Sequence, residues 1–231
     1  MTDIGGLALA TAAFVGTHLV LSHLFRIRLV GAMGESAFVL LYSLIAALTL
    51  GWMIFAWYSV NASIPFWIAP AWAWPVASGI MLIASILLAG SLFGNPAFPN
   101  PGRQMRAPKE AKGIFAITRH PMNWSFMLWA LVHIGLWGSP QTLIVAGGIL
   151  ILAFAGSIGQ ERKKRALLGP SWREWESRTS FVPFGALLTG RARWRNAAPG
   201  WKAVGIALVF WLAVTWIHAP TVSPIAALLN R

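Results

Sequence analysis

The chain has 231 residues and a formal net charge of +12; 57% of its residues are hydrophobic and only 10% charged, and its mean hydropathy is +0.65. A soluble domain carries about 25% charged residues, so this composition excludes an ordinary soluble protein. The chain has no cysteine, which excludes disulfides, thiolate zinc sites and cysteine nucleophiles.

Six apolar blocks follow one another along the chain, each long enough to cross a hydrocarbon core of about 30 Å. They occupy residues 4–24, 36–58, 75–93, 121–138, 141–159 and 203–219. No Lys or Arg precedes the first block, and a signal peptide needs a positive start, so we interpret this block as a retained span. The sequence therefore predicts an all-α transmembrane helix bundle of about six spans in a single integral membrane domain, residues 1–231.

The basic residues are distributed unevenly between the segments that join these spans. Of the 18 Lys and Arg residues, 17 fall in 25–35, 94–120 and 160–202, and only Arg231 lies elsewhere. Because Lys and Arg concentrate on the cytoplasmic side, the pattern predicts a multi-pass protein of the bacterial inner (cytoplasmic) membrane with both termini outside. Its expected partners are anionic lipid headgroups, and nucleic-acid binding is not expected.

The connecting segments differ in character. The connector 59–74 is uncharged and rich in Pro and aromatic residues, which predicts a segment lying on the outer membrane surface. Gly138-Ser139-Pro140 is so short that it predicts a tight hairpin between the fourth and fifth spans. The segment 94–120 is rich in turn residues, and the cytoplasmic segment 160–202 is expected to begin with an extension of the fifth span through Arg165.

Histidines inside predicted spans are costly to bury, and each is therefore a functional hypothesis. His18 on the first span and His133 on the fourth could ligate a haem iron, which takes one axial ligand from each side. At 1.5 Å rise per residue their depths differ by about 9 Å, a difference that helix tilt could absorb. The alternative is that each imidazole only hydrogen-bonds a backbone carbonyl or a Ser or Thr. His218 is expected at the outer interface.

Arg119-His120-Pro121 marks the expected start of the fourth span, because Pro is favoured in the first turn of a helix. A helix N-terminus is already the positive end of a dipole, so Arg119 and His120 there require an anion. The pattern predicts a site for a carboxylate or phosphate group; lipid phosphate is the alternative source.

Acidic residues are few. Glu161 closes the fifth span and is expected to pair with Arg165, four residues later. Glu174 and Glu176 are expected to be surface charges. The sequence contains no Walker loop, GxGxxG, HExxH or GxSxG motif, so hydrolase, NTPase and zinc-enzyme functions have no support.

Six short motifs in chain order resemble the NnrU family of bacterial membrane proteins. They are Gly16-Thr17-His18 with Leu24-Phe25-Arg26, Gly34-Glu35, Leu41-Tyr42-Ser43, Thr118-Arg119-His120-Pro121, Leu128-Trp129-Ala130-Leu131-Val132-His133, and Thr179-Ser180-Phe181-Val182-Pro183-Phe184. The resemblance covers most of the chain and implies an association with denitrification, that is, with nitrite and nitric oxide reduction.

The NnrU family is in turn similar to the plant cis-zeta-carotene isomerase, a haem b membrane enzyme. That resemblance implies haem b as cofactor and His18 and His133 as its axial ligands. Ala130 departs from the isomerase, which has a cysteine three residues before the second histidine. A redox-linked exchange of haem ligands through that cysteine is therefore not expected to carry over.

The second half of the chain also resembles the isoprenylcysteine carboxyl methyltransferases and phospholipid methyltransferases. By that resemblance Arg119, His120 and Glu161 would contact S-adenosylmethionine. This sequence differs from those methyltransferases at two points: Ser125 replaces a glycine after the Arg-His-Pro motif, and Gln160-Glu161 replaces a pair of glutamates.

Three hypotheses follow for function. The first is a haem b protein with a redox or isomerase-type role, in which Arg119 and His120 pair with an anionic group such as a haem propionate. The second is an S-adenosylmethionine-dependent membrane methyltransferase with Glu161 in its site. The third is a non-catalytic assembly partner of respiratory complexes. The expected ligand is small and either hydrophobic or anionic.

Overall fold

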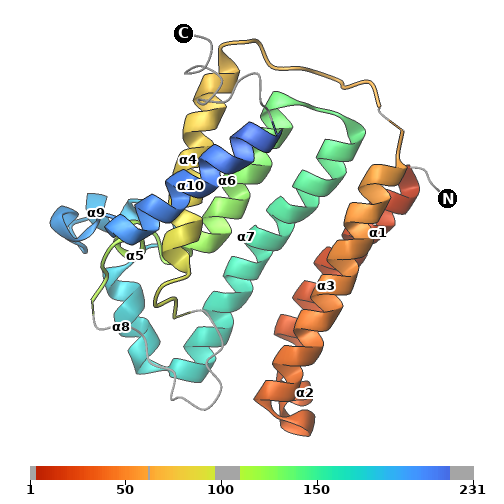
Figure 1. Cartoon of the computed structure of the whole chain (residues 1–231). Helices are drawn as coiled ribbons and strands as arrows, with labels where there is room; N and C mark the ends of the chain where they lie inside the picture. The colour runs from red at the N-terminus through yellow and green to blue at the C-terminus, as the bar shows by residue number, and fades with distance from the viewer. Residues whose placement is uncertain (1–3, 62, 97–109, 219–231) are drawn as a thin grey trace.

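The computed structural model describes residues 4–61, 63–96 and 110–218 and is all-α in this part of the chain. Four of the basic residues in the charge distribution lie outside the described residues: Arg103, Arg106, Lys109 and Arg231. The elements in chain order are α1 (Ile4–Leu19), a π-helical turn η1 (Val20–Leu24), α2 (Arg26–Met33), α3 (Glu35–Ser59), α4 (Ala73–Ser91), α5 (Ile114–Ile117), α6 (Pro121–Leu136), α7 (Pro140–Leu168), α8 (Pro170–Arg178), α9 (Gly185–Leu188), a 3-10 turn η2 (Trp194–Asn196) and α10 (Trp201–His218) (Figure 1).

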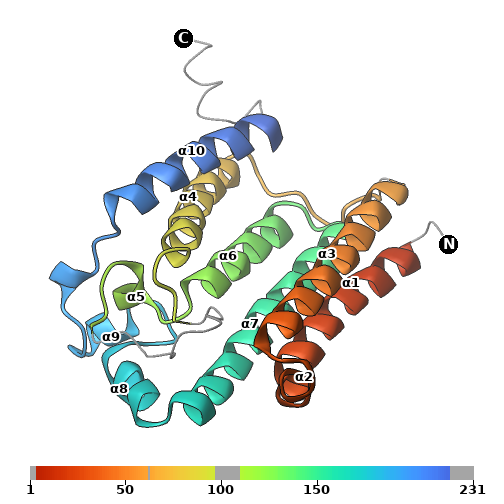
Figure 2. The same ribbon diagram turned by 60° about the horizontal axis from the view of Figure 1, so that its bottom comes forward.

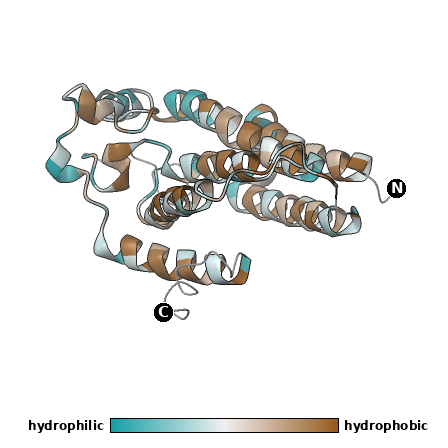
Figure 3. Ribbon diagram, turned by 90° about the horizontal axis from the view of Figure 1, so that it is seen from above, coloured by the Kyte–Doolittle hydropathy of each residue, from teal (hydrophilic) through white to brown (hydrophobic). Residues whose placement is uncertain are grey.

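Within the described residues, five helical stretches are long and apolar enough to cross a membrane, so the chain is a multi-pass membrane protein. They are Ile4–Leu24, Glu35–Ser59, Ala73–Ser91, Pro140–Leu168 and Trp201–His218. The expected fourth span corresponds to α6, which has only 16 residues and is shorter than these five. Hydrophobic residues dominate the long helices, as Figure 3 shows.

The long helices form a row in which each one packs against the next. α10 contacts α4, α4 contacts α6, α6 contacts α7, α7 contacts α1, and α1 contacts α3 (Figure 2). α7 therefore lies between α1 and α6. The short helices α5, α8 and α9 gather at one end of α4, α6 and α7, where α6 begins (Figure 1). We call this the polar end of the bundle, because it carries Arg119, His120 and Glu161.

Local sequence explains the turn between α6 and α7. Ser139 caps α7 by accepting a hydrogen bond from the backbone N–H of Thr142 at 3.2 Å, and Pro140 occupies the first helical position. The connector after α3 pairs with this hairpin: the N–H of Phe66 donates to the carbonyl of Gly138 at 2.9 Å. The predicted tight hairpin is confirmed, and α7 extends through Arg165 as expected and ends three residues later, at Leu168.

Glycines on α7 set how closely α1 approaches it. A Cβ atom added at Gly148 would lie 2.4 Å from Cγ2 of Thr11, and one added at Gly159 would lie 2.4 Å from the ring of His23. Such small residues let helices pack closely in lipid. Gly147, by contrast, has nothing within 4 Å of its added Cβ.

This contrast predicts that two neighbouring glycine-to-alanine substitutions change the stability of the protein differently. Gly148→Ala should be less stable than Gly147→Ala by about 1–3 kcal/mol, because only the first crowds α1 while both gain the same helix propensity. Thermal unfolding of both variants in the same detergent measures the difference. Equal melting temperatures would show that α1 does not pack on α7 at Gly148.

Candidate functional site at the polar end

The Arg119-His120 pair lies in the extended link between α5 and α6. Thr118 anchors this link: its hydroxyl donates to the carbonyl of Phe181 at 2.8 Å and accepts from the N–H of His120 at 3.3 Å. The N–H of Arg119 donates to the carbonyl of Ser180 at 2.7 Å. α6 begins at Pro121, as the sequence predicts. The link and the segment after α8 thus hold each other in place.

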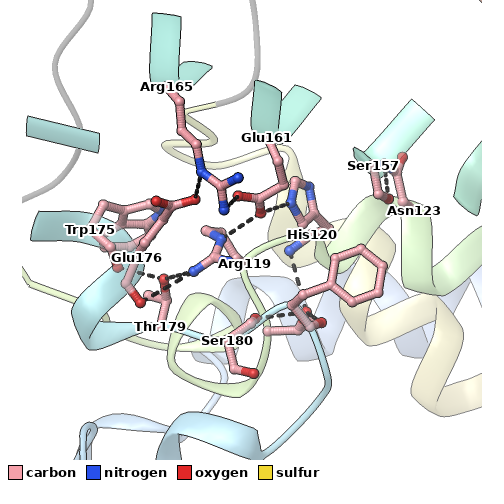
Figure 4. A network of polar contacts seen from close by, with 12 residues as sticks. Arg119, His120, Asn123, Ser157, Glu161, Arg165, Trp175, Glu176, Thr179 and Ser180 are labelled. Atoms are coloured by element: carbon pink, nitrogen blue, oxygen red, sulfur yellow. Dashed lines mark hydrogen bonds and ion pairs between the residues drawn. The ribbon is translucent and has the colours of Figure 1, made fainter. Parts of the chain in front are cut away.

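Glu161, from α7, receives both basic side chains on one oxygen. Nε of Arg119 donates to Oε1 of Glu161 at 2.7 Å, and Nε2 of His120 contacts the same oxygen at 2.6 Å (Figure 4). The three residues are only 8%, 4% and 8% exposed. A carboxylate can only accept, so Nε2 of His120 carries the proton in this contact.

Arg119 also fixes the short helix α8 over the site. Its Nη1 donates to the hydroxyl of Thr179 at 2.9 Å and to the carbonyl of Glu176 at 3.4 Å. Thr179 in turn donates to the carbonyl of Trp175 at 2.6 Å. One guanidinium therefore joins the start of α6, the end of α7 and the end of α8.

The electrostatics of the site follow from this arrangement. Arg119 and His120 lie at the positive N-terminal end of α6, and the sequence predicts that they need an anion. The carboxylate of Glu161 is such an anion, 2.7 Å from Arg119 and supplied by the chain itself. The sequence did not reveal Glu161 as the partner of Arg119, because it suggested only the pair of Glu161 with Arg165, four residues later. That pair is also present, with Nη2 of Arg165 3.7 Å from Oε2 of Glu161.

A second acidic residue borders the cluster. Nε of Arg165 donates to Oε1 of Glu176 at 2.7 Å. Burial raises the pKa of the Glu176 carboxyl above its usual range, and the neighbouring Glu161 adds to this effect, while Arg165 opposes it. Glu176 is therefore part of the site's edge rather than an isolated surface charge. Glu174 does behave as expected, in an exposed pair with Arg178.

A small recess opens beside the cluster. Its volume is about 30 Å³, and its walls include Arg119, His120, Asn123 and Gln160. Nδ2 of Asn123 donates to the hydroxyl of Ser157 at 2.7 Å, a polar link between α6 and α7 that the sequence did not single out. This volume holds water or one small polar group, whereas pockets for whole cofactors measure roughly 300–1,000 Å³.

His18 and His133 share one local arrangement. Nδ1 of His18 bonds the carbonyl of Phe14 at 2.7 Å, and Nδ1 of His133 bonds the carbonyl of Trp129 at 2.8 Å. A carbonyl only accepts, so Nδ1 carries the proton and Nε2 keeps its lone pair in both rings. The backbone contact that the sequence offered as an alternative is present, and it leaves each Nε2 able to ligate a metal.

The two histidines lie on opposite sides of α7. Gly148 of α7 meets α1, whereas Ser157 of α7 bonds Asn123 of α6. Ser157 follows Gly148 by nine residues, which is two and a half turns of a helix with 3.6 residues per turn, so the two positions face opposite ways.

Their depths also differ. Thr11 lies beside Gly148 on the parallel helix α1, which puts His18 about level with Ala155. The Asn123–Ser157 bond puts His133, further along the antiparallel helix α6, about level with Gly147. At 1.5 Å rise per residue these levels, eight residues apart on α7, differ by about 12 Å. Each histidine fits an axial ligand of haem iron, but in this arrangement the two do not fit opposite faces of one haem.

His133 instead meets His218. The ring centroids of His133, at the end of α6, and His218, at the end of α10, are 5.9 Å apart. The sequence places His218 at the interface and gives it no partner, since nothing in it says which helix α10 would meet. Within the described part of the chain, no group of three or more His, Asp or Glu side chains could hold a metal ion.

The buried ion pair predicts a large effect of one neutral substitution. Glu161→Gln keeps the size of the side chain but leaves Arg119 buried without its anion, so it should cost about 3–5 kcal/mol of unfolding free energy. The matched control is Glu174→Gln, because its pair with Arg178 is exposed and its loss should change stability by only about 0.5 kcal/mol. Chemical unfolding in mixed micelles gives both values, and equal effects would contradict the buried pair.

Comparison with known proteins gives one family and one partial relative. Residues 6–224 match the family described as NnrU protein. The 15-cis-zeta-carotene isomerase, chloroplastic, of Zea mays is 30% identical over 82 residues, which is 35% of this chain and 22% of the isomerase. The similarity thus spans less than a quarter of that relative's length, and no solved structure matches. The family match covers nearly the whole chain, and the chain therefore belongs to the NnrU family.

Proposed function

We propose that this chain binds haem b within the membrane through His18 and supports an isomerase-type or redox reaction on a small hydrophobic molecule. A link to nitrogen-oxide metabolism is part of this proposal. The observation that carries it is the hydrogen bond from Nδ1 of His18 to the carbonyl of Phe14, which fixes the tautomer with a free Nε2. The partial similarity to a carotene isomerase supports the type of reaction.

The surroundings of His18 suit a ligand residue. Its ring packs against Phe14 at 4.2 Å and against Tyr42 of α3 at 5.4 Å between centroids. These aromatic neighbours restrict the orientation of the imidazole. The chain's own residues thus orient the ring and hold its proton on Nδ1; haem, when bound, would supply an iron that takes small ligands or one electron.

The absorption spectrum of detergent-purified protein, produced with a haem precursor, tests this proposal. We expect a Soret band that His18→Ala abolishes and that His23→Ala, the matched change on the same helix, retains. We expect His133→Ala to retain it as well, because His133 lies across α7. A flat visible spectrum from monodisperse wild-type protein would reject haem binding, and loss of the band in both His18→Ala and His133→Ala would show that the helices rearrange around one iron.

A methyltransferase is the second candidate, and one observation favours it. The structure brings Arg119, His120 and Glu161 together beside a recess, as the methyltransferase resemblance requires. Binding of S-adenosylmethionine would have to open this recess and compete with the internal ion pair. Calorimetric titration with S-adenosylmethionine decides: binding that Arg119→Ala removes would support a methyltransferase, and absence of heat with folded protein would set it aside.

We also propose that the polar end faces the cytoplasm and that α6 completes a sixth crossing, so that both termini lie outside. The distribution of Lys and Arg supports this orientation. The chain has no cysteine, so a single introduced cysteine is the only thiol in the protein that a reagent can label. In intact spheroplasts a membrane-impermeant thiol reagent should label Ser63→Cys, in the connector after α3, and not Ser177→Cys on α8. Labelling of only Ser177→Cys would show that the orientation is the opposite of the one proposed.

A further inference from the structure

The ends of α6 and α10 bring two histidines together away from the polar end. Their ring centroids lie 5.9 Å apart with the ring planes inclined by 42°. The pairing does not follow from general packing of the two helices, since α10 packs mainly on α4, where Nε1 of Trp211 donates to the carbonyl of Ser78 at 3.0 Å.

The state of His133 is already suited to metal binding. Its Nδ1 donates to the carbonyl of Trp129, and the ring lies beside that indole at 4.4 Å between centroids, with the two planes inclined by 32°. The carbonyl contact leaves Nε2 as the donor atom, and metal-bound histidines commonly hold their other ring nitrogen in such a bond. His218 is exposed, so an ion can reach the pair without opening the bundle.

We propose that His133 and His218 form a two-histidine site for a transition-metal ion of the kind that imidazole binds, such as Zn²⁺ or Cu²⁺. Two nitrogens that bind the same ion lie about 3.3–4 Å apart, from a tetrahedral to a linear angle at the metal, because each metal–nitrogen bond is about 2.0–2.1 Å long. Rings with centroids 5.9 Å apart reach that separation when their nitrogens turn toward each other. The pair supplies two coordination positions, and the exposed side of His218 leaves the others open to water or to an external ligand.

This inference goes beyond the proposed function and does not depend on it. His18 lies across α7 from His133, so haem at His18 and an ion at His133 are separate events. Their failures are distinguishable as well, since the visible spectrum reports haem and a zinc titration reports the histidine pair. A haem band that required His133 and His218 but not His18 would assign the pair to haem iron and overturn the proposed ion site.

The experiment is a calorimetric titration of Zn²⁺ into full-length protein purified in detergent through a tag without histidine. We expect one ion per chain for the wild type and loss of that binding in both His133→Ala and His218→Ala. The controls are His18→Ala and His23→Ala, which should bind as the wild type does. His218→Cys should bind again, because a thiolate is also a zinc ligand, whereas a merely structural role of His218 predicts no such rescue.

A second measurement keeps the inference falsifiable if a variant folds poorly. Zinc should raise the melting temperature of the wild type, because an ion that binds only the folded state stabilises it, and it should not raise that of His218→Ala. Wild-type protein that binds no Zn²⁺, or variants of both histidines that bind as well as the wild type, would overturn the site.

Discussion

The polar end of this protein depends on one buried carboxylate. Glu161 accepts from Arg119 and His120 on the same oxygen, and these two residues lie at the N-terminus of α6, where positive charge is unfavourable without an anion. Arg119 also donates to Thr179, directly after α8, so the guanidinium that Glu161 holds in turn fixes the segment at the end of α8. Without Glu161, three separate elements would meet at an uncompensated guanidinium.

The second constraint is the position of α7 in the row of helices. Gly148 of α7 faces α1, whereas the polar residues Ser157 and Glu161 of the same helix face α6 and the link before it. This helix thereby separates two regions that bear different chemistry. His18 lies on one side with Tyr42, while His133 lies on the other near His218. The three proposed ligands therefore have three separate sites: haem at His18, a small ligand at the recess and a metal ion at the histidine pair.

The sequence predicted the parts of this structure that depend on local composition. The apolar blocks, the start of α6 at Pro121 and the extension of α7 through Arg165 all follow from hydropathy and from residues with strong positional preferences. The need for an anion near Arg119 was also predictable, but its source was not, because Glu161 lies 42 residues further along the chain. The meeting of His133 with His218 depends on the order of helices in the row, which no local pattern specifies.

The coupling free energy between Arg119 and Glu161 tests the central claim most directly. It is obtained from the unfolding free energies of the wild type, Arg119→Met, Glu161→Gln and the double variant. If the carboxylate of Glu161 is the anion that Arg119 requires, the double variant should lose about 2–3 kcal/mol less than the sum of the two single losses. Additive losses in the double variant would show that the two residues act independently, and the account of the polar end would then be wrong.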